Sequence, residues 1–187
     1  MSIKQNLTAI TRELDSYAAM VNEEELSAVI PMLLQAERIF VAGSGRSGFV
    51  GRAFANRMMH LGLRMHVVGE TTTPSIRSKD VLFVISGSGN TASHVNNARL
   101  AKAEGAAVIT ITIFPQNQIG SVADARIVLP GKTDKIEDTK HQAESAQPAG
   151  NMFEQLSWLT CDSIAMELQK QLRQTQDQMH YRHANME

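Results

Sequence analysis

The chain has 187 residues, with 18 basic and 19 acidic side chains and a formal net charge of −1. Hydrophobic residues make up 43% and charged residues 20%, which is typical of a folded domain and excludes a disordered chain. The balanced charge argues against a nucleic-acid-binding surface, and no apolar run approaches the roughly 20 residues of a membrane helix. Cys161 is the single cysteine and no secretory signal is visible at the start. We therefore expect a cytoplasmic α/β protein without disulfides, membrane or nucleic-acid partners.

In chain order, the segment 4–37 carries apolar residues at helical spacing and predicts two helices separated near Asn22. Short apolar runs then alternate with helix-length segments. The expected strands are 38–42, 64–68, 80–86, 107–112 and 125–129, and the expected helices between them are 47–63 and 91–104. Strands that are apolar throughout and separated by helices are typical of βαβ units. The core at 38–130 is therefore predicted to be a parallel sheet covered on both faces.

After Pro130 the composition changes. Residues 131–149 are polar and nearly free of large apolar side chains, which predicts a long surface loop that is either a functional lid or disordered. Helical spacing returns at 151–171, and the last residues, 180–187, are too polar to predict a packed element. We see no repeat and no linker, so we expect a single domain over 1–187, in which 150–187 forms a C-terminal helix and tail.

Two strands end in glycine-rich turns that carry hydroxyl groups. The first turn is Gly43-Ser44-Gly45-Arg46-Ser47-Gly48 and the second is Ser86-Gly87-Ser88-Gly89-Asn90-Thr91, each followed by an expected helix. Ligands of open parallel sheets bind at the carboxyl ends of strands, and a helix N-terminus there offers free N–H groups to an anion. Either turn alone can be an ordinary connection, with glycine at positive φ and serine as N-cap. Two such turns in one short chain favour an anion site.

Two kinds of anion fit this pattern. The first turn satisfies G-x-G-x-x-G after a strand, and Glu70 stands where a dinucleotide enzyme places its ribose-binding acid. The second turn has hydroxyl groups that a dinucleotide fold does not require, and no lysine follows its glycines as in a nucleotide P-loop. A cup rich in hydroxyls and without lysine suits a phosphate monoester. We therefore rank a sugar phosphate first and a dinucleotide second.

With these turns in view, the sequence resembles the sugar isomerase (SIS) family. The resemblance covers nearly the whole chain and is carried by both turns, by the segments 58–60 and 66–70, by Gln147-Pro148-Ala149-Gly150-Asn151-Met152-Phe153-Glu154-Gln155 and by the terminal Arg182-His183-Ala184-Asn185-Met186-Glu187. Ala149-Gly150-Asn151 departs from the family pattern, in which a bulkier residue is expected after Pro148. Within the family, the likeness is to the branch that isomerises hexulose phosphates.

The resemblance implies a flavodoxin-like three-layer α/β/α sandwich with a five-stranded parallel sheet. It also implies an isomerase without metal or cofactor that interconverts D-arabino-3-hexulose 6-phosphate and D-fructose 6-phosphate. That reaction belongs to the ribulose monophosphate pathway of formaldehyde assimilation, next to a hexulose-6-phosphate synthase. The resemblance further implies a homotetramer with active sites near subunit boundaries.

Moving a carbonyl between adjacent sugar carbons through an enediol requires a base, a proton donor and a grip on the distant phosphate. By the family's Phe-Glu-Gln position, Glu154 is the expected base; from the residues alone it is a carboxylate in a first helical turn. His60 departs from the apolar stripe of its helix and is a candidate acid or ring-opening group, or a subunit contact. His183 is expected either to dock into a site, its own or a neighbour's, or to fray. The expected substrate-binding residues are Gly45, Arg46, Ser47, Ser86, Gly87, Ser88, Asn90 and Thr91, with Arg46 contacting a substrate oxygen or Glu154.

The remaining histidines, His66, His94, His141 and His180, show no metal-ligand spacing and are interpreted as structural or surface residues. Three other functions stay open: a dehydrogenase using the first turn, a sugar-phosphate-binding module without catalysis, and a different sugar isomerase of the same family. The N-terminal helices are too few and insufficiently basic for a DNA-reading domain, which argues against the module.

Overall fold

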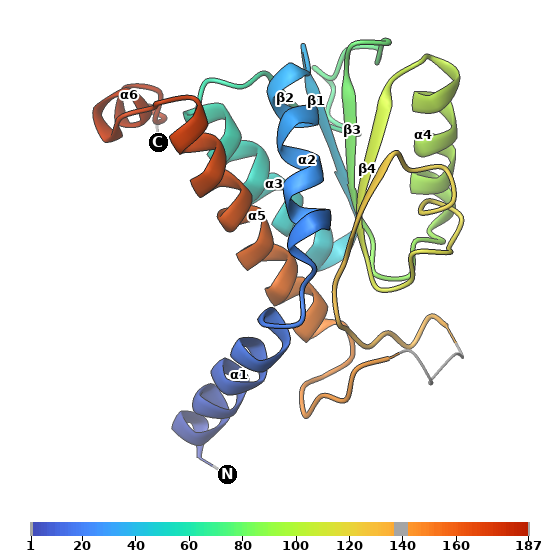
Figure 1. Ribbon diagram of the computed structural model, residues 1–187, viewed down its shortest axis with the longest axis vertical. Coiled ribbons are helices and arrows are strands. Elements are labelled where there is room, and N and C mark those ends of the chain that lie inside the picture. The colour runs from blue at the N-terminus through green and yellow to red at the C-terminus, as the bar shows by residue number, and fades with distance from the viewer. Residues whose placement is uncertain (1, 137–141, 187) are drawn as a thin grey trace.

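The computed structural model describes residues 2–136 and 142–186. In that part of the chain five strands form one parallel sheet in the order β2-β1-β3-β4-β5 (Figure 1). The strands are β1 (Ile39–Gly43), β2 (Met65–Val67), β3 (Val81–Ile85), β4 (Ala107–Thr112) and β5 (Ala125–Val128). The helices are α1 (Ile3–Ala18), α2 (Glu23–Gln35), α3 (Gly45–His60), α4 (Ala92–Ala103), α5 (Asn151–Gln171) and α6 (Gln176–Tyr181). The three-layer α/β/α fold with a five-stranded parallel sheet is confirmed.

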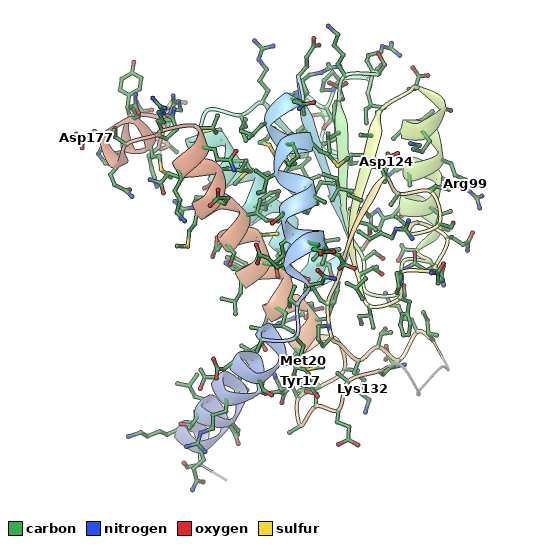
Figure 2. All side chains as sticks on the ribbon, viewed as in Figure 1. Tyr17, Met20, Arg99, Asp124, Lys132 and Asp177 are labelled. Atoms are coloured by element: carbon green, nitrogen blue, oxygen red, sulfur yellow. The ribbon has the colours of Figure 1, made fainter. Side chains whose placement is uncertain are left out.

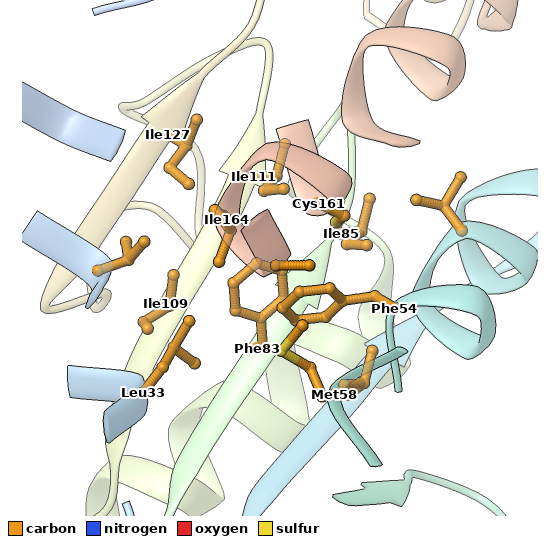
Figure 3. Packing of buried hydrophobic residues seen from close by; sticks show 14 of the residues in the cluster. Leu33, Phe54, Met58, Phe83, Ile85, Ile109, Ile111, Ile127, Cys161 and Ile164 are labelled. Atoms are coloured by element: carbon orange, nitrogen blue, oxygen red, sulfur yellow. The ribbon is translucent and has the colours of Figure 1, made fainter. Parts of the chain in front are cut away.

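The three central strands, β1, β3 and β4, bury both of their faces, which explains their unbroken apolar runs, whereas the edge strands β2 and β5 are partly half-buried. In β3, Phe83 and Ile85 face a core shared with α2, α3 and α5, whereas Leu82 and Val84 face α4. Figure 3 shows the first core, in which side chains of β3 to β5 pack against those of the three helices. The second core is smaller and packs α4 against the other face of β1, β3 and β4, together with Ile119. The sheet is thus covered by three helices on one face and by one on the other (Figure 1).

The two N-terminal helices differ in how they pack. Helix α2 buries Val29, Ile30 and Leu33 against the sheet. Helix α1 has no buried residue and extends away from the sheet (Figure 1). At its C-terminal end, Tyr17 donates a hydrogen bond of 2.7 Å from its hydroxyl to the carbonyl oxygen of Glu144. Helix α1 therefore contacts the 142–149 segment but leaves most of its apolar side chains exposed.

Two expectations for the C-terminal half need comment. The 131–149 segment contains no helix or strand where it is described, and its backbone is held by hydrogen bonds from Ala143 N to Gly131 O and from Gly150 N to Lys132 O. His141 lies outside the described residues. The expectation that 180–187 forms no packed element is wrong in part, because α6 reaches Tyr181, Arg182 hydrogen-bonds His60 O and Gln174, and the His183 ring stacks on that of His60. A capping box on Thr175 starts this helix, a local signal that outweighs its polar composition.

Across residues 2–136 and 142–186, we find no helix with the length and apolar character needed to cross a membrane.

Candidate active site

The two glycine-rich turns meet at the switch point of the sheet. Strands β1 and β3 are neighbours, and the chain leaves β1 toward β2 on one side and leaves β3 toward β4 on the other. Register pairs Gly43 with Ile85, so both turns start at the same level of the sheet. A crevice at this point is where open α/β sheets bind their ligands. Helices α3 and α4 begin at the turns and direct their N-termini toward it.

A cavity of about 260 Å³ lies at this switch point. It brings together both turns, the start of α5 and the polar loop. Its lining comprises Ser44, Gly45, Arg46, Ser47, Ile85, Ser86, Gly87, Ser88, Thr91, His94, Ile113, Lys132, Thr133, Asp134, Lys135, Ala149, Gly150, Phe153 and Glu154. Of the expected binding residues, Asn90 alone is not in this lining; its side-chain oxygen accepts a 3.1 Å hydrogen bond from Gln118 N instead. Asn90 thus holds the 114–118 turn.

Backbone conformation explains the glycines in the turns. Gly45 has φ of 56°, in the left-handed region that favours glycine, and this residue opens α3. Gly89 has φ of 61°, and a Cβ placed on it would overlap the Asn117 side chain. Asn117 in turn donates to Thr112 Oγ1 at 2.7 Å and accepts from Gly120 N at 2.6 Å. Gly45 is therefore favoured by its backbone conformation alone, whereas Gly89 is also required by the close approach of the Asn117 side chain.

Three helix N-termini face the cavity without side-chain caps. The N-cap residues Ser44, Thr91 and Gly150, of α3, α4 and α5, all line the cavity, and none caps its helix with its side chain. The other helices in the described part of the chain, α1, α2 and α6, are all capped by their N-cap side chains. Uncapped N–H groups and the positive ends of three helix dipoles converge here, an arrangement that favours a bound anion.

The hydroxyls of the second turn are arranged as donors. Ser86 Oγ accepts a hydrogen bond from Gly89 N at 3.2 Å, and Ser88 Oγ accepts one from Asn90 N at 3.4 Å. Both serines are buried. Because each oxygen already accepts from the turn, its hydroxyl hydrogen is available to donate to a ligand. The two serine hydroxyls of the second turn can therefore donate to the same anion that the N–H groups of the helix N-termini bind.

Lysines also reach the cavity, which corrects the description of a cup without lysine. Lys132 and Lys135 come from the polar loop, and Figure 2 shows Lys132 below the sheet near Tyr17. Together with Arg46 they place three cations in the lining, against the carboxylates of Asp134 and Glu154. Neither lysine could be predicted as a site residue, because nothing in the spacing of a polar loop shows where it folds back.

Glu154 lies in the first turn of α5 at the edge of the cavity, paired with Arg46. The Nε–H of Arg46 donates to Glu154 Oε2. The Glu154 side chain is 17% exposed and that of Arg46 is 61% exposed, so the carboxylate is mostly covered while the guanidinium meets solvent. A carboxylate held beside an anion site has the chemistry of a proton acceptor for a bound ligand. Of the two contacts expected for Arg46, the structure shows the one with Glu154.

His60 and His183 lie together, but not with Glu154. Their rings stack with centroids 4.9 Å apart at the C-terminal end of α3. Arg182 fixes the tail there by donating to the carbonyl oxygen of His60 at 3.1 Å and to Gln174 Oε1 at 2.8 Å. The 16 residues of α3 separate this pair from the cavity by roughly 22 Å along the helix axis. Figure 2 likewise shows Lys132 and Asp177 of α6 at opposite ends of the molecule.

His94 is a cavity residue that the sequence analysis set aside as structural. It lies in the first turn of α4, it is buried, and its Nε2 is 2.8 Å from Ser44 Oγ. Burial, and secondarily the charge of Lys135, lower the pKa of His94, so the ring is neutral near pH 7. The sequence signal that could have placed His94 in the site is its position three residues after Thr91, the N-cap of the helix that follows the second glycine-rich turn.

Comparison with known proteins agrees with this geometry. The family model of the SIS domain matches residues 32–143, and the chain belongs to the SIS family. It is 37% identical to the 3-hexulose-6-phosphate isomerase of Mycobacterium gastri, over 99% of this chain and 92% of that protein. It is 34% identical to the 3-hexulose-6-phosphate isomerase of Bacillus subtilis over the full length of both. The chain is accordingly an isomerase.

A solved structure is similar over the same length. It is a hypothetical protein from Methanococcus jannaschii, whose crystal structure inferred a molecular function of 3-hexulose-6-phosphate isomerase. The TM-score is 0.83 at 33% identity, over 98% of this chain and 99% of that one.

Proposed function

We propose that this isomerase interconverts D-arabino-3-hexulose 6-phosphate and D-fructose 6-phosphate in the cytoplasm. The observation that carries the proposal is the convergence of three uncapped helix N-termini and the second-turn hydroxyls on one cavity that ends at Glu154. The substrate's phosphate is bound by the helix N-termini, the Ser86 and Ser88 hydroxyls and the loop lysines. Its open-chain carbons then extend toward Glu154. The names of the relatives in Mycobacterium gastri and Bacillus subtilis support this choice of sugar.

In the proposed mechanism, Glu154 removes the proton from C2, next to the C3 carbonyl, and returns it to C3 through a cis-enediol, while the proton of the C2 hydroxyl passes to the C3 oxygen. No net oxidation occurs, because the carbonyl and the hydroxyl exchange places on adjacent carbons. Arg46 lies against the carboxylate and can donate to the developing oxyanion on the substrate. Binding energy from the phosphate, which does not react, holds the reacting carbons in place.

The size of the cavity favours this substrate over a dinucleotide. About 260 Å³ lies below the roughly 300–1,000 Å³ of pockets for drug-sized ligands, and a dinucleotide is larger than a hexulose phosphate. Glu70, the candidate ribose-binding acid, is ion-paired with Arg52 instead. Both observations favour a phosphate monoester in the first turn.

We further propose that the enzyme is a homotetramer and that a neighbouring chain supplies His60 and His183 to the cavity of this one. Within one chain the stacked pair lies at the far end of α3 from Glu154. Large apolar side chains are exposed near the cavity, namely Leu7, Phe49, Trp158 and Leu159. An apolar surface of this kind supports self-association next to the site.

The decisive experiment supplies the substrate enzymatically. The pure protein is incubated with ribulose 5-phosphate, formaldehyde and a hexulose-6-phosphate synthase, and fructose 6-phosphate is measured over time. We expect fructose 6-phosphate to appear only when both proteins are present. Binding of fructose 6-phosphate without any turnover would indicate a sugar-phosphate-binding module. Quenching of Trp158 fluorescence by a nicotinamide dinucleotide, but not by fructose 6-phosphate, would indicate the dehydrogenase.

A further inference from the structure

One hydrogen bond joins the first glycine-rich turn to helix α4 at the cavity. Ser44 of the first turn and His94, one helical turn into α4, are 2.8 Å apart between Oγ and Nε2. Ser44 is the N-cap of α3, and His94 is 7% exposed. Both line the cavity. The bond therefore ties the start of one ligand-facing helix to the first turn of the other.

Ser44 has the backbone of a helix cap but not the hydrogen bond of one. Its φ of −117° and ψ of 152° are those of an ordinary N-cap residue, and serine there normally accepts from an N–H of the first turn. Ser2 at the start of α1 does so, accepting from Gln5 N at 3.2 Å. Ser44 makes no such bond, and its hydroxyl contacts His94 instead. The N–H groups at the start of α3 consequently stay open toward the cavity.

The environment of His94 indicates that this contact is not made for stability alone. Within residues 2–136 and 142–186, its second ring nitrogen, Nδ1, is buried and has no hydrogen-bond partner. An unpaired buried polar atom costs stability, so an apolar side chain here would pack at lower cost. The ring also lines the cavity and lies within the influence of the Lys135 charge. In the described part of the chain, the hydrogen-bond partner of the His94 ring is therefore the hydroxyl that would otherwise cap α3.

We propose that His94 is a positioning residue of the anion site. By holding Ser44 Oγ, it keeps that hydroxyl from capping α3 and leaves the N–H groups of Arg46 and Ser47 free for the substrate's phosphate. This role rests on the proposed function, since it assigns the phosphate to the N-terminus of α3. His94 in this role affects the affinity of the site for the substrate's phosphate and not the proton transfer at Glu154.

The proposal predicts an unusual rescue. In His94→Leu, Ser44 loses its partner, caps α3 and competes with the anion. We expect the KM for the hexulose phosphate, and the Kd for fructose 6-phosphate and for inorganic phosphate, to rise about fivefold, a factor typical of one N-cap hydrogen bond, with kcat nearly unchanged. Removing the competing hydroxyl as well, in Ser44→Ala/His94→Leu, should restore these constants to within about twofold of the wild type.

Two further variants serve as a conservative replacement and a control. His94→Gln places an amide where Nε2 stands and should keep the wild-type constants within about twofold, because it can still hold Ser44. Ser93→Ala is the matched control, an exposed neighbour on α4 that does not line the cavity. If His94→Leu does not fold, His94→Asn replaces it, because asparagine is too short to reach Ser44. Binding is measured by calorimetry and folding by circular dichroism.

Unchanged phosphate affinity in His94→Leu overturns the proposal, and so does a double variant that binds no better than the single one. A purely structural role for His94 predicts that second result, since a second substitution cannot repair a packing defect. Calorimetry with inorganic phosphate tests the role of His94 separately from the proposed isomerase reaction. If phosphate binding follows the predicted pattern while no hexulose phosphate is isomerised, the role of His94 stands and the proposed function fails.

Discussion

Glu154 and Arg46 form an ion pair in which the two partners differ in exposure. The carboxylate is mostly covered, whereas the guanidinium is largely in solvent. Because its guanidinium is largely in solvent, the pair contributes little to stability, about 0–1 kcal/mol by comparison with surface ion pairs. Its place at the rim of an anion cavity is therefore better explained by chemistry than by folding.

Glu154→Gln tests that role. The amide keeps the size of the side chain and can still contact Arg46, but it cannot accept a proton. We expect kcat to fall by roughly 10²–10⁴-fold, the usual contribution of a general base, with fructose 6-phosphate still bound. Steady-state kinetics and calorimetry measure the two effects.

Glu70→Gln is the matched control, because Glu70 is also ion-paired with an arginine but lies outside the cavity. It should turn over normally. Near-normal turnover in Glu154→Gln would exclude that residue as the base.

The lowered pKa of His94 predicts how stability depends on pH. The unfolded chain protonates this histidine near its ordinary value of 6.5, whereas the folded protein does so only at lower pH, because of burial and then Lys135. Below 6.5 the unfolded state thus binds more protons, so the free energy of unfolding falls as the pH is lowered and levels off below the folded pKa. Burial lowers the pKa of His66 as well, which adds to the same slope.

Urea unfolding above and below pH 6.5 measures this slope, and His94→Gln should make it shallower. In NMR titrations, Lys135→Ala should raise the pKa of His94 toward its ordinary value without reaching it, since burial remains. A His94 pKa at or above 6.5 in the wild type would contradict this account.

Among the elements, α3 separates the functional residues into two groups. Its N-terminal end contributes to the anion cavity and its C-terminal end carries His60 stacked on His183 of the tail. The tail is held by Arg182, whose guanidinium donates to the carbonyl of His60 and to Gln174. The tail is thus ordered by contacts within its own chain.

Deleting residues 182–187 tests whether this distant end serves catalysis. If a neighbouring chain brings His60 and His183 to the cavity, the truncated protein should lose about 10²-fold or more in kcat, the usual contribution of an acid–base group. Its own cavity should still bind inorganic phosphate. Activity assays and calorimetry on the same preparation separate the two effects.

His183→Ala serves as the companion variant, since it keeps Arg182 and its contacts. Undiminished turnover in both proteins would assign the tail to structure alone.

Several elements could be predicted from the sequence because their signals are local. The run 107–112 matches β4, and 151–171 matches α5 residue for residue. Helix α3 begins two residues before its predicted start, at Gly45, because the left-handed conformation of that glycine opens the helix inside the turn. Helix α6 was not predicted, because polar composition alone was considered and the capping box at Thr175 was not.

At the scale of the whole molecule, much apolar surface has no partner within the chain. Helix α1 buries no residue, and Phe49 and Trp158 are 67% and 45% exposed close to the cavity. Phe49 and Trp158 line one apolar hollow beside Arg46 and Glu154, and a contiguous exposed apolar patch commonly marks an interaction surface. They agree with the proposed tetramer.

Phe49→Asp should therefore dissociate the assembly, because burying a carboxylate in an apolar contact is costly. Analytical ultracentrifugation should show a smaller species, and turnover should fall with it if the histidines act across subunits. Leu100→Asp is the control, an equally apolar and exposed site on α4, which covers the opposite face of the sheet. Monomeric wild-type protein would contradict the tetramer directly.

The composition of the site shows where prediction from sequence ends. The two turns could be found because each lies within six consecutive residues after a strand. Lys132 and Lys135 could not, because they reach the cavity through a loop whose path depends on contacts with α1 and α5. The Ser44–His94 bond joins positions 50 residues apart and has no sequence pattern at all.

The two turns belong to adjacent strands, β1 and β3, yet the chain between them passes through α3 and β2. A ligand in the cavity would contact both turns at once, and these two segments of the chain separate when the sheet unfolds. It would bind the native state and not the denatured one, so saturating fructose 6-phosphate should delay heat denaturation in proportion to the logarithm of its concentration. A thermal-shift titration would thus register occupancy even in a variant that has lost all turnover.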